Sequence, residues 1–462
     1  MVLVPTHIKI NKIDEDVISK VKIPTEEIST TIPYKDWKKI KKPCSVFKLP
    51  IEYCKFRVDN GRIATEITTH ETSKGILDPN AESTQKLISD FLSESDVSNN
   101  ETLINSLKRD GQKEPAVVTA DGFLINGNRR KWALQVLNKD NPSEDYKYLK
   151  VIILPGTDDP LRPTVSDIAL MENEFQVYSD GRSEYSSMNK ALTLYKNVQK
   201  GIELREMLRQ DPDFSNLDDR EFKRNLKKYE KKFYRPVELM IEYLKVNKVK
   251  NDFVRVANKW SAFQDMSERI IEHLDDERSL ATYQIQENEK GLIKSAAFNI
   301  IKLRNHEDVD QRTHKLISRF MNWISVDKKE VIKIGKIDDD DNFENINDAN
   351  ERFNKWNDKY NDQIVNSIKK LDSLTARKKD QEGPINRLND ILNKLDHDEL
   401  KHTSLTYMDR TDIPNARKLA NSIQTRSTLL TKLLYAIEKD DKERLAELIE
   451  MYNSRHKNED NN

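Results

Sequence analysis

Residues 121–137, which read DGFLINGNRRKWALQVL, hold the side chains whose types and order most directly suggest chemistry. An apolar strand leads into Gly127, and the apolar spacing that follows predicts a helix over residues 129–137 with Asn128 as its N-terminal cap. A strand that passes through a glycine into a helix N-terminus gathers unpaired backbone N–H groups, and this geometry is typical of phosphate sites. The pattern therefore predicts that this turn binds an anion.

The first turn of that helix carries three adjacent cations, Arg129, Arg130 and Lys131. Because the helix dipole is positive at this end, each cation costs roughly 0.3–1 kcal/mol there. A bound phosphate would offset this cost, and arginine can bind phosphate through two parallel hydrogen bonds. A solvated basic turn is the alternative. We predict a phosphate-binding site made by Gly127, Asn128, Arg129 and Arg130.

A second polar group lies on the helix predicted about 40 residues further along the chain, where Ser166 or Asp167 can act as the N-terminal cap. Glu172, Asn173 and Gln176 share one side of this helix. A carboxylate beside a carboxamide can hold Mg²⁺ together with phosphate oxygens, or it can polarise a water molecule. We predict Glu172 as the catalytic and magnesium-binding carboxylate, with Asn173 and Gln176 as nucleotide ligands. An ordinary solvated helix face is the alternative.

The elements that must position these side chains form a small α/β unit over residues 46–160. β-Branched and aromatic residues predict a strand after residue 46, a hairpin over residues 116–126 and a strand over residues 149–154. Residues 1–45 are polar and irregular, and we predict that they form an N-terminal extension. The expected fold class is an α+β N-terminal domain followed by a mostly α-helical remainder.

The remainder of the chain has helical periodicity with one interruption. We predict a helical domain over residues 161–335 and a helical C-terminal region over residues 351–462. Between them, like-charge repulsion in an aspartate run predicts an extended acidic linker over residues 336–350. An apolar stripe between Leu429 and Leu448 must pack against another helix, in the same chain or in a second copy. A homodimer through the C-terminal helices is therefore a candidate.

A basic segment lies within the predicted helical domain, at residues 217–246. Its pattern predicts one helix capped by Asp218 and another that begins at Pro236, which is the order of elements in a helix-turn-helix. Sequence-specific DNA binding, nonspecific binding and RNA binding are alternatives, as is a solvated helix face. The cations that predict contact with a nucleic-acid backbone are Lys223, Arg224, Lys227, Lys228, Lys231, Lys232 and Arg235.

Together these segments resemble the N-terminal domain of the ParB/sulfiredoxin-like superfamily. The family's GERR box is similar to residues 127–130, GNRR, and its ENxQR box is similar to residues 172–177, ENEFQV. Residues 107–115 resemble the family's entry segment. Residues 60–62, NGR, resemble its NPR segment, and this likeness adds Arg62 to the predicted nucleotide site.

The resemblance covers about residues 46–198 and implies both a fold and a function. It implies a ParB/sulfiredoxin-like α/β domain with a pocket between the GNRR and ENEFQV segments. It further implies that this pocket binds an NTP, with CTP favoured, together with Mg²⁺. The leading hypothesis is a nucleotide-binding protein in which the bound NTP controls attachment to nucleic acid, with DNA favoured as the partner.

Two positions depart from the family pattern, because Asn128 stands where the family has glutamate and Val177 where it has arginine. Any nucleotide turnover is expected to be slow, because the sequence supplies no evident arginine finger and no strong general base beyond Glu172. The corresponding loop offers no cysteine, which excludes the thiol chemistry of sulfiredoxins. A kinase or other phosphotransferase of the same fold is an alternative, with Glu52, Asp59 or Glu172 as its base. A helical interaction scaffold of a mobile element or defence system is a third hypothesis.

The composition limits these hypotheses. The 462 residues include 78 Lys and Arg against 79 Asp and Glu, so attraction to nucleic acid must be local rather than global. No apolar run reaches the roughly 20 residues of a membrane span, so we expect a cytoplasmic location and no membrane partner. Cys44 and Cys54 are too few and too far apart for a zinc site of cysteines. Only 11 glycines favour helices over a turn-rich β architecture.

Overall fold

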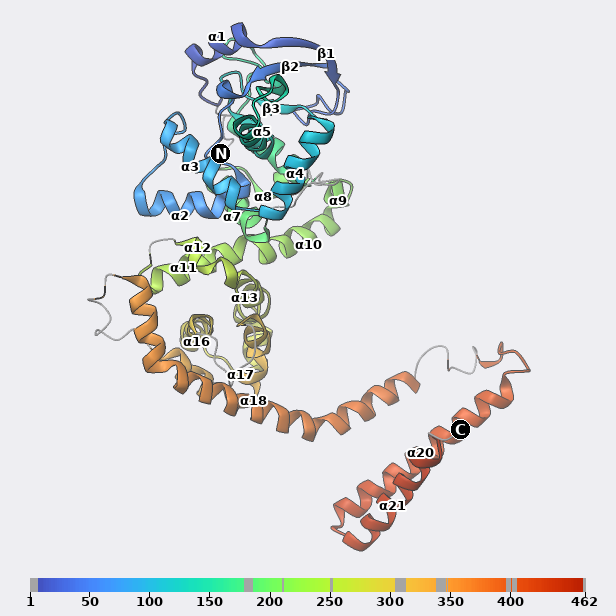
Figure 1. The fold of residues 1–462 in the computed structure, drawn as a ribbon. Coiled ribbons are helices and arrows are strands. Elements are labelled where there is room, and N and C mark those ends of the chain that lie inside the picture. The colour runs from blue at the N-terminus through green and yellow to red at the C-terminus, as the bar shows by residue number, and fades with distance from the viewer. Residues whose placement is uncertain are drawn as a thin grey trace. The chain divides into compact units, whose positions relative to one another are not determined.

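The structure, a computed structural model, describes residues 7–177, 186–209, 212–249, 252–303, 313–337, 346, 348–395, 400 and 405–459. Residues 176, 177, 212, 213 and 452–459 are described without their side chains. The chain divides into two compact units, Met1–Thr375 and Ala376–Asn462. The first unit begins with a small mixed sheet and continues as helices (Figure 1), which confirms the predicted order of an α+β region and a mostly helical remainder.

The sheet has five strands in the order β1-β2-β5-β3-β4. β3 runs parallel to β5, and the other neighbouring strands are antiparallel. The predicted hairpin is present, since Val117 pairs with Asn126 across β3 and β4. The strands are β1 (Ile23–Ser29), β2 (Cys44–Pro50), β3 (Ala116–Val118), β4 (Leu124–Asn126) and β5 (Tyr148–Ile153).

Helices connect and cover these strands. The helix predicted after Gly127 and the helix predicted to carry Glu172 are both present. The helix over residues 64–74 escaped prediction because its sequence, ATEITTHETSK, has too few apolar residues to set a helical period. The helices of this region are α1 (Lys12–Val21), α2 (Ala64–Lys74), α3 (Glu82–Glu94), α4 (Val97–Asp110), α5 (Asn128–Asp140) and α6 (Val165–Val177).

Different helices cover the two faces of the sheet. Side chains alternate along a strand. Val118 and Val151 therefore lie in the core that α5 covers, whereas Val117 and Ile152 lie in the core that α6 covers. α5 and α6 therefore lie on opposite faces of the sheet.

The prediction of an irregular extension over residues 1–45 is wrong for its described part. This segment contains α1 and β1, and β1 pairs antiparallel with β2. β1 is one of the two edge strands of the sheet, and the burial of its side chains does not alternate. A strand exposed on both faces carries no period-two signal in its sequence. The α/β region therefore begins before residue 46.

The rest of the first unit is helical and packs around a large apolar core that includes Trp323 and Trp356, both fully buried. The helices used below are α7 (Ser187–Gln199), α8 (Leu204–Arg209), α10 (Asp219–Tyr229), the π-helical segment η4 (Glu230–Tyr234), α11 (Arg235–Val246), α13 (Trp260–Asp265), the π-helical segment η6 (Met266–Ile271), α16 (Lys290–Lys302), α17 (Thr313–Gly335) and α18 (Ala349–Leu395).

The basic segment at residues 217–246 is not a helix-turn-helix. Asp218 caps α10 as predicted, but α10, η4 and α11 follow one another without a turn. Pro236 cannot donate a backbone hydrogen bond, so a helix that runs through it leaves carbonyl groups unpaired. Ser267 Oγ donates to the carbonyl of Lys231 (2.7 Å), and Gln264 Nε2 donates to that of Lys232 (3.1 Å). These side chains let the helix pass the proline through a π-helical turn.

The C-terminal unit contains the end of α18, α20 (Ile413–Glu438) and α21 (Lys442–Glu459). Pro384 lies inside α18, which continues through it as one helix. The predicted apolar stripe is covered in part within the chain, because Leu429 and Leu448 are buried between α20 and α21. Leu434 and Ile437 stay exposed.

The predicted acidic linker lies largely outside the described residues, which omit residues 338–345 and 347. α18 already begins at Ala349. None of the helices in the described part of the chain combines the length and the apolar character needed to span a bilayer.

Candidate functional site

A cavity of about 250 Å³ lies beside the β3–β4 hairpin, between α6 and α7. Its walls come from four places: the loop that leads into α2, the hairpin, and one side of each of the two helices. Ile8 and Lys9, from the start of the chain, also line it. The charged side chains in the lining are Lys9, Arg57, Asp59, Asp121, Glu172, Lys196 and Lys200.

Helix α6 brings Glu172 into this cavity. Thr164 and Asp167 cap the helix reciprocally: the N–H of Asp167 donates to Thr164 Oγ1 (3.0 Å), and the N–H of Thr164 donates to Asp167 Oδ2 (2.8 Å). Ile168 and Met171 bury the neighbouring helix face in the core of the sheet. The register places Glu172 at the edge of this buried face, where only 7% of its surface is exposed.

Arg57 lies between two carboxylates. Its Nη1 is 3.4 Å from Glu172 Oε1, and its Nη2 is 4.0 Å from Asp59 Oδ2. Lys200 Nζ lies 2.7 Å from the same Asp59 oxygen. The cavity thus holds a chain of alternating charges in which Glu172 is the most buried member.

The pKa values of the two carboxyl groups in this row of charges, Glu172 and Asp59, are shifted in opposite directions. Burial raises the pKa of Glu172 to about 7, and the charge of Asp59 adds to this effect against the opposing charges of Arg57 and Lys200. Burial also disfavours the charged form of Asp59, but Lys200 and Arg57 outweigh it and lower its pKa. One carboxyl group therefore holds its proton near neutral pH while its neighbour is ionised, which is an arrangement suited to acid–base chemistry.

Several buried donors of the cavity make no hydrogen bond within the described residues. Arg57 Nη1 and Asn60 Nδ2 are buried and make no hydrogen bond, although Asn60 Oδ1 accepts from the N–H of Arg62. Within the described residues Lys196 has no hydrogen-bond or ion-pair partner, and burial lowers its pKa. A buried donor without an acceptor costs about 1–3 kcal/mol. A ligand that offers only acceptors would remove this cost.

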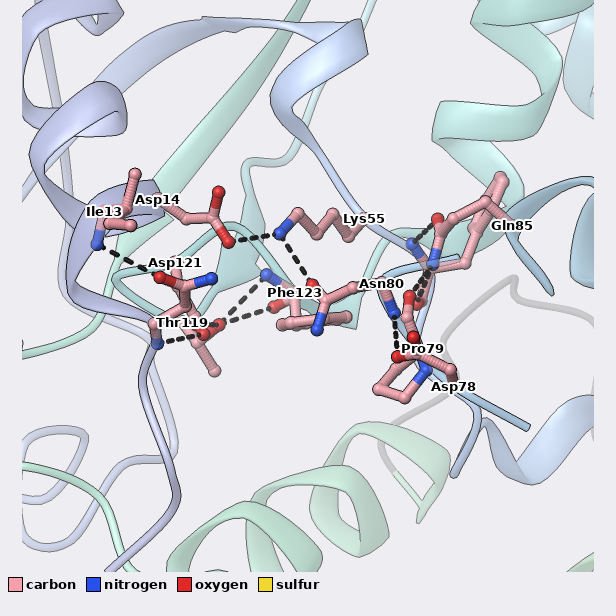
Figure 2. A network of polar contacts seen from close by, with 12 residues as sticks. Ile13, Asp14, Lys55, Asp78, Pro79, Asn80, Gln85, Thr119, Asp121 and Phe123 are labelled. Carbon is pink, nitrogen blue, oxygen red and sulfur yellow. Dashed lines mark hydrogen bonds and ion pairs between the residues drawn. The ribbon is translucent and has the colours of Figure 1, made fainter. Parts of the chain in front are cut away.

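A polar network fixes the wall of the cavity on the hairpin side (Figure 2). Lys55 Nζ donates to Asp14 Oδ2 (2.6 Å) and to Asn80 Oδ1 (2.9 Å). Gln85 accepts from the N–H of Phe56 (2.7 Å) and donates to its carbonyl oxygen (2.9 Å). These bonds hold the extended segment that precedes Arg57, so the guanidinium is positioned by its backbone as well as by its ion pairs.

The start of α5 differs from its prediction. The cap is Gly127, with φ +89°, and Asn128 does not cap the helix but donates weakly to the carbonyl of Leu124 (3.5 Å). A Cβ on Gly127 would lie 2.6 Å from the Cβ of Ala116. The glycine is therefore required by its backbone conformation and by close packing against β3.

The arginines at the start of α5 have partners within the fold. Arg129 Nε donates to Asn100 Oδ1 (2.9 Å), and its Nη1 lies 3.9 Å from Asp96 Oδ2. Arg62 Nη1 lies 3.8 Å from the same oxygen. Arg130 donates to the carbonyl of Glu114. The carboxylate of Asp96 therefore supplies part of the negative charge that was expected from a bound phosphate at this turn.

The structure thus separates the predicted site residues into two places. Glu172 lines the cavity, whereas the four residues of the GNRR segment, 127–130, do not. Asn173 points elsewhere, because its Nδ2 donates to the carbonyl of Met207 on α8 (3.1 Å). The side chain of Gln176 lies outside the described residues.

Sequence reasoning missed most of the residues that surround Glu172, namely Arg57, Asn60, Lys196 and Lys200. Asp59 was named only as a candidate base for a kinase. A weak signal existed, since Lys196 and Lys200 are one helical turn apart and Arg57 and Asp59 alternate along an extended segment. Neither pattern identifies its partner, which lies more than a hundred residues away in the chain.

The predicted nucleic-acid-binding cations lie along α10, η4 and the first residue of α11. Lys231 pairs with Glu272, and Arg235 Nη1 lies 3.3 Å from Asp275 Oδ2. Arg224 lies 3.6 Å from Glu221, one turn earlier. The remaining four are exposed and form no ion pair with any described residue: Lys223, Lys227, Lys228 and Lys232.

Comparisons with protein-family models, with curated proteins and with solved structures find no match to this chain. Within the described residues no group of three or more histidine, cysteine, aspartate or glutamate side chains is arranged to hold a metal ion by itself. Any Mg²⁺ at the cavity would therefore need oxygen ligands from a bound molecule, in addition to Glu172 and Asp59.

Proposed function

We propose that this chain is a ParB-like nucleotide-binding protein, in which an NTP in the cavity controls attachment to nucleic acid. CTP is the favoured nucleotide and DNA the favoured partner. The observation that carries the proposal is the pair of buried donors at the cavity that make no hydrogen bond, Arg57 Nη1 and Asn60 Nδ2, beside the lining residue Lys196. Phosphate oxygens only accept hydrogen bonds, so a nucleotide's phosphates match this set.

The cavity's size supports binding of the phosphate-bearing part of a nucleotide. Its volume of about 250 Å³ is near the lower end of ligand pockets, roughly 300–1,000 Å³. Arg57, Lys196 and Lys200 would hold phosphate oxygens, and Glu172 with Asp59 would supply oxygen ligands to a nucleotide-bound Mg²⁺. Bound Mg²⁺ would neutralise charge on the phosphates. Glu172 would hold or accept a proton beside them, and turnover is expected to be slow.

Helix α7 supports the proposed coupling between the cavity and the basic segment. One side of α7 contributes Lys196 to the cavity. From the same helix, Lys190 Nζ lies 5.4 Å from the ring centre of Phe233, and the rings of Tyr195 and Tyr234 are 5.3 Å apart. A ligand that moves Lys196 therefore acts on a helix that is packed against η4. Coupling requires two discrete positions of α7 with different affinities for the ligand.

Calorimetric titration with the four common NTPs and Mg²⁺ tests the binding proposal. We expect binding with CTP preferred, and we expect Arg57→Ala to weaken it about 10- to 100-fold, since a hydrogen bond to a charged group contributes about 1.5–3 kcal/mol. Arg109→Ala is the matched control, because Arg109 is exposed and, among the described residues, pairs with its neighbour Asp110 alone. Absence of binding to every NTP would refute the proposal.

A phosphotransferase is the second candidate function. The raised pKa of Glu172 and the lowered pKa of Asp59 favour it, because a transfer reaction needs an ionised base near a bound phosphate. Nucleotide consumption that depends on an added acceptor, and is unaffected by DNA, would support this candidate over the first.

An interaction scaffold is the third candidate, and the exposed apolar side chains of the C-terminal unit favour it. Leu388, Ile391 and Leu395 of α18 are each at least 39% exposed, as are Leu434 and Ile437 of α20. Such a surface is typical of a contact with another protein. Self-association of the full chain with loss on Leu434→Glu, together with no nucleotide binding, would favour this candidate and the homodimer.

A further inference from the structure

Cations dominate one face of the α10–η4 helix, which Glu221 borders at 3.6 Å from Arg224. Arg220, Lys223, Arg224, Lys227 and Lys228 follow the spacing i, i+3, i+4, i+7 and i+8, which places them on one side of a helix. The opposite side follows the same spacing with apolar residues and is packed against the protein. Its members are Phe222, Leu226, Tyr229 and Phe233.

The helix is anchored, so this face is presented in a fixed orientation. Lys231 pairs with Glu272 and Arg235 with Asp275, both on the helix that follows α13. Gln264 and Ser267 bind the carbonyl groups of the π-helical turn. A rigid row of charges loses less conformational entropy on binding than flexible side chains on a loop.

Apart from the cations of the row itself, of which Arg224 lies 3.6 Å from Glu221, the described residues of this region offer no side chain placed to read the edges of bases. Asn225 is the one carboxamide of α10, and its Nδ2 donates to the carbonyl of Glu221 (3.0 Å). In α11, where a recognition helix was predicted, Val237 and Met240 are buried and Glu242 pairs with Lys294. Direct readout needs carboxamide or arginine side chains that enter a groove.

The aromatic rings among these cations do not form a stacking surface. The rings of Tyr229 and Phe233 are 4.6 Å apart and lie over the core below α10, and Lys190 Nζ is 5.4 Å from the ring centre of Phe233. Single-stranded nucleic acid is held mainly by stacking of its bases on exposed rings. These rings are used by the fold instead.

We infer that the α10–η4 face binds the phosphate backbone of duplex DNA without reading its sequence. The inference rests on the nucleic-acid part of the proposed function and specifies its mode. The side chains that make the contacts are Lys223, Lys227, Lys228 and Lys232. From residue 223 to residue 232 the row is about 14 Å long, at ~1.5 Å per residue. Duplex DNA of this length carries roughly eight phosphates.

Fluorescence anisotropy with the full chain tests this inference. The probes are two duplexes of equal length and unrelated sequence, and a single strand of the same length, at salt from about 50 to 200 mM. We expect the two duplexes to bind within about threefold of each other, and more tightly than the single strand. The logarithm of affinity should fall with that of salt with a slope of about −3 to −4, or about −0.9 per neutralised phosphate.

The double substitution Lys227→Glu and Lys228→Glu should weaken both duplexes equally, by at least tenfold, and make the slope shallower by about two. Lys86→Glu on the exposed side of α3 is the matched control and should leave binding unchanged. Circular dichroism checks that each variant is folded.

Three outcomes would overturn the inference: more than tenfold preference for one duplex, tighter binding of the single strand, or equal binding by the double variant and Lys86→Glu. Calorimetry with CTP on the same samples separates the two proposals. Duplex binding without nucleotide binding would refute the switch and leave this inference standing. Nucleotide binding without duplex binding would refute this inference alone.

Discussion

The start of α5 and the cavity beside α6 both gather arginine, yet they use it differently. At α5, Arg129 is held by Asn100 and Asp96, and Arg130 by a backbone carbonyl. At the cavity, Asn60 Nδ2 and Arg57 Nη1, which lies 3.4 Å from Glu172, are buried and make no hydrogen bond. Arg129 Nη2 also makes none, but Arg129 does not line the cavity. Adjacent cationic residues in a sequence are therefore weak evidence for a ligand site. Donors that make no hydrogen bond and also line a cavity are stronger evidence.

Gly127→Ala should have the largest effect and tests the structural role of the α5 turn. The new Cβ would meet Ala116 at 2.6 Å in a backbone with φ +89°, so we expect the free energy of unfolding to fall by about 2–4 kcal/mol. Gly75→Ala is the control, because Gly75 has φ +102° but nothing within 4 Å of its Cβ position. It should cost only about 1 kcal/mol. Equal losses in chemical denaturation would contradict the packing role.

The pH dependence of the free energy of unfolding tests whether Glu172, in the cavity, holds its proton in the folded protein. Burial raises the pKa of Glu172 from 4.5 to about 7, so the folded protein binds more protons than the unfolded chain between these values. Stability from this group is complete below pH 4.5 and is lost as pH rises towards 7, by up to about 3 kcal/mol. Glu172→Gln should remove this loss. If denaturation of wild type and variant shows the same pH slope in this window, Glu172 does not hold its proton in the fold.

Arg57→Ala and Arg129→Ala, measured side by side, test whether the nucleotide binds at the cavity or at the start of α5. Arg57→Ala should weaken nucleotide binding about 10- to 100-fold. Arg129→Ala should leave binding within about twofold but lower the free energy of unfolding by about 1–2 kcal/mol, because Asn100 and Asp96 lose their partner. The measurements are calorimetric titration and chemical denaturation of both variants. The reverse pattern would place the ligand at the start of α5.

Lys200→Met should have the smallest effect. Its ion pair with Asp59 is partly exposed, with 37% and 46% of the two side chains accessible, and such pairs contribute about 0.2–1 kcal/mol. We expect a change in the free energy of unfolding within this range and a loss of nucleotide affinity below that of Arg57→Ala. A larger loss than that of Arg57→Ala would show that Lys200 is the main phosphate ligand.

Local patterns predicted the elements near the site. The β3–β4 hairpin, the helix after Gly127 and the helix that carries Glu172 follow from alternation, a glycine and a helical period. The edge strand β1 escaped prediction because it buries neither face. The helix through Pro236 escaped because its carbonyl groups are bound by side chains of Gln264 and Ser267, about thirty residues later in the sequence.

Residues of the candidate site were predicted only where a single residue stood out from its sequence neighbours by its type or charge. Glu172 stood out as a carboxylate beside a carboxamide, but its ion-pair partner Arg57 is far away in the sequence. Arg129 stood out by charge, and its partners Asp96 and Asn100 were not visible from its neighbours. Pairings across such distances depend on how the sheet brings its loops together, which no local pattern specifies.

The central claim is that the cavity's unpaired donors hold phosphate, and a structure of the protein with a nonhydrolysable CTP analogue and Mg²⁺ tests it most directly. The account predicts phosphate oxygens within hydrogen-bonding distance of Arg57 Nη1 and Asn60 Nδ2, with Lys196 beside them. Phosphates bound at Arg129 and Arg130 instead, or a cavity that the analogue leaves empty at saturating concentration, would contradict it.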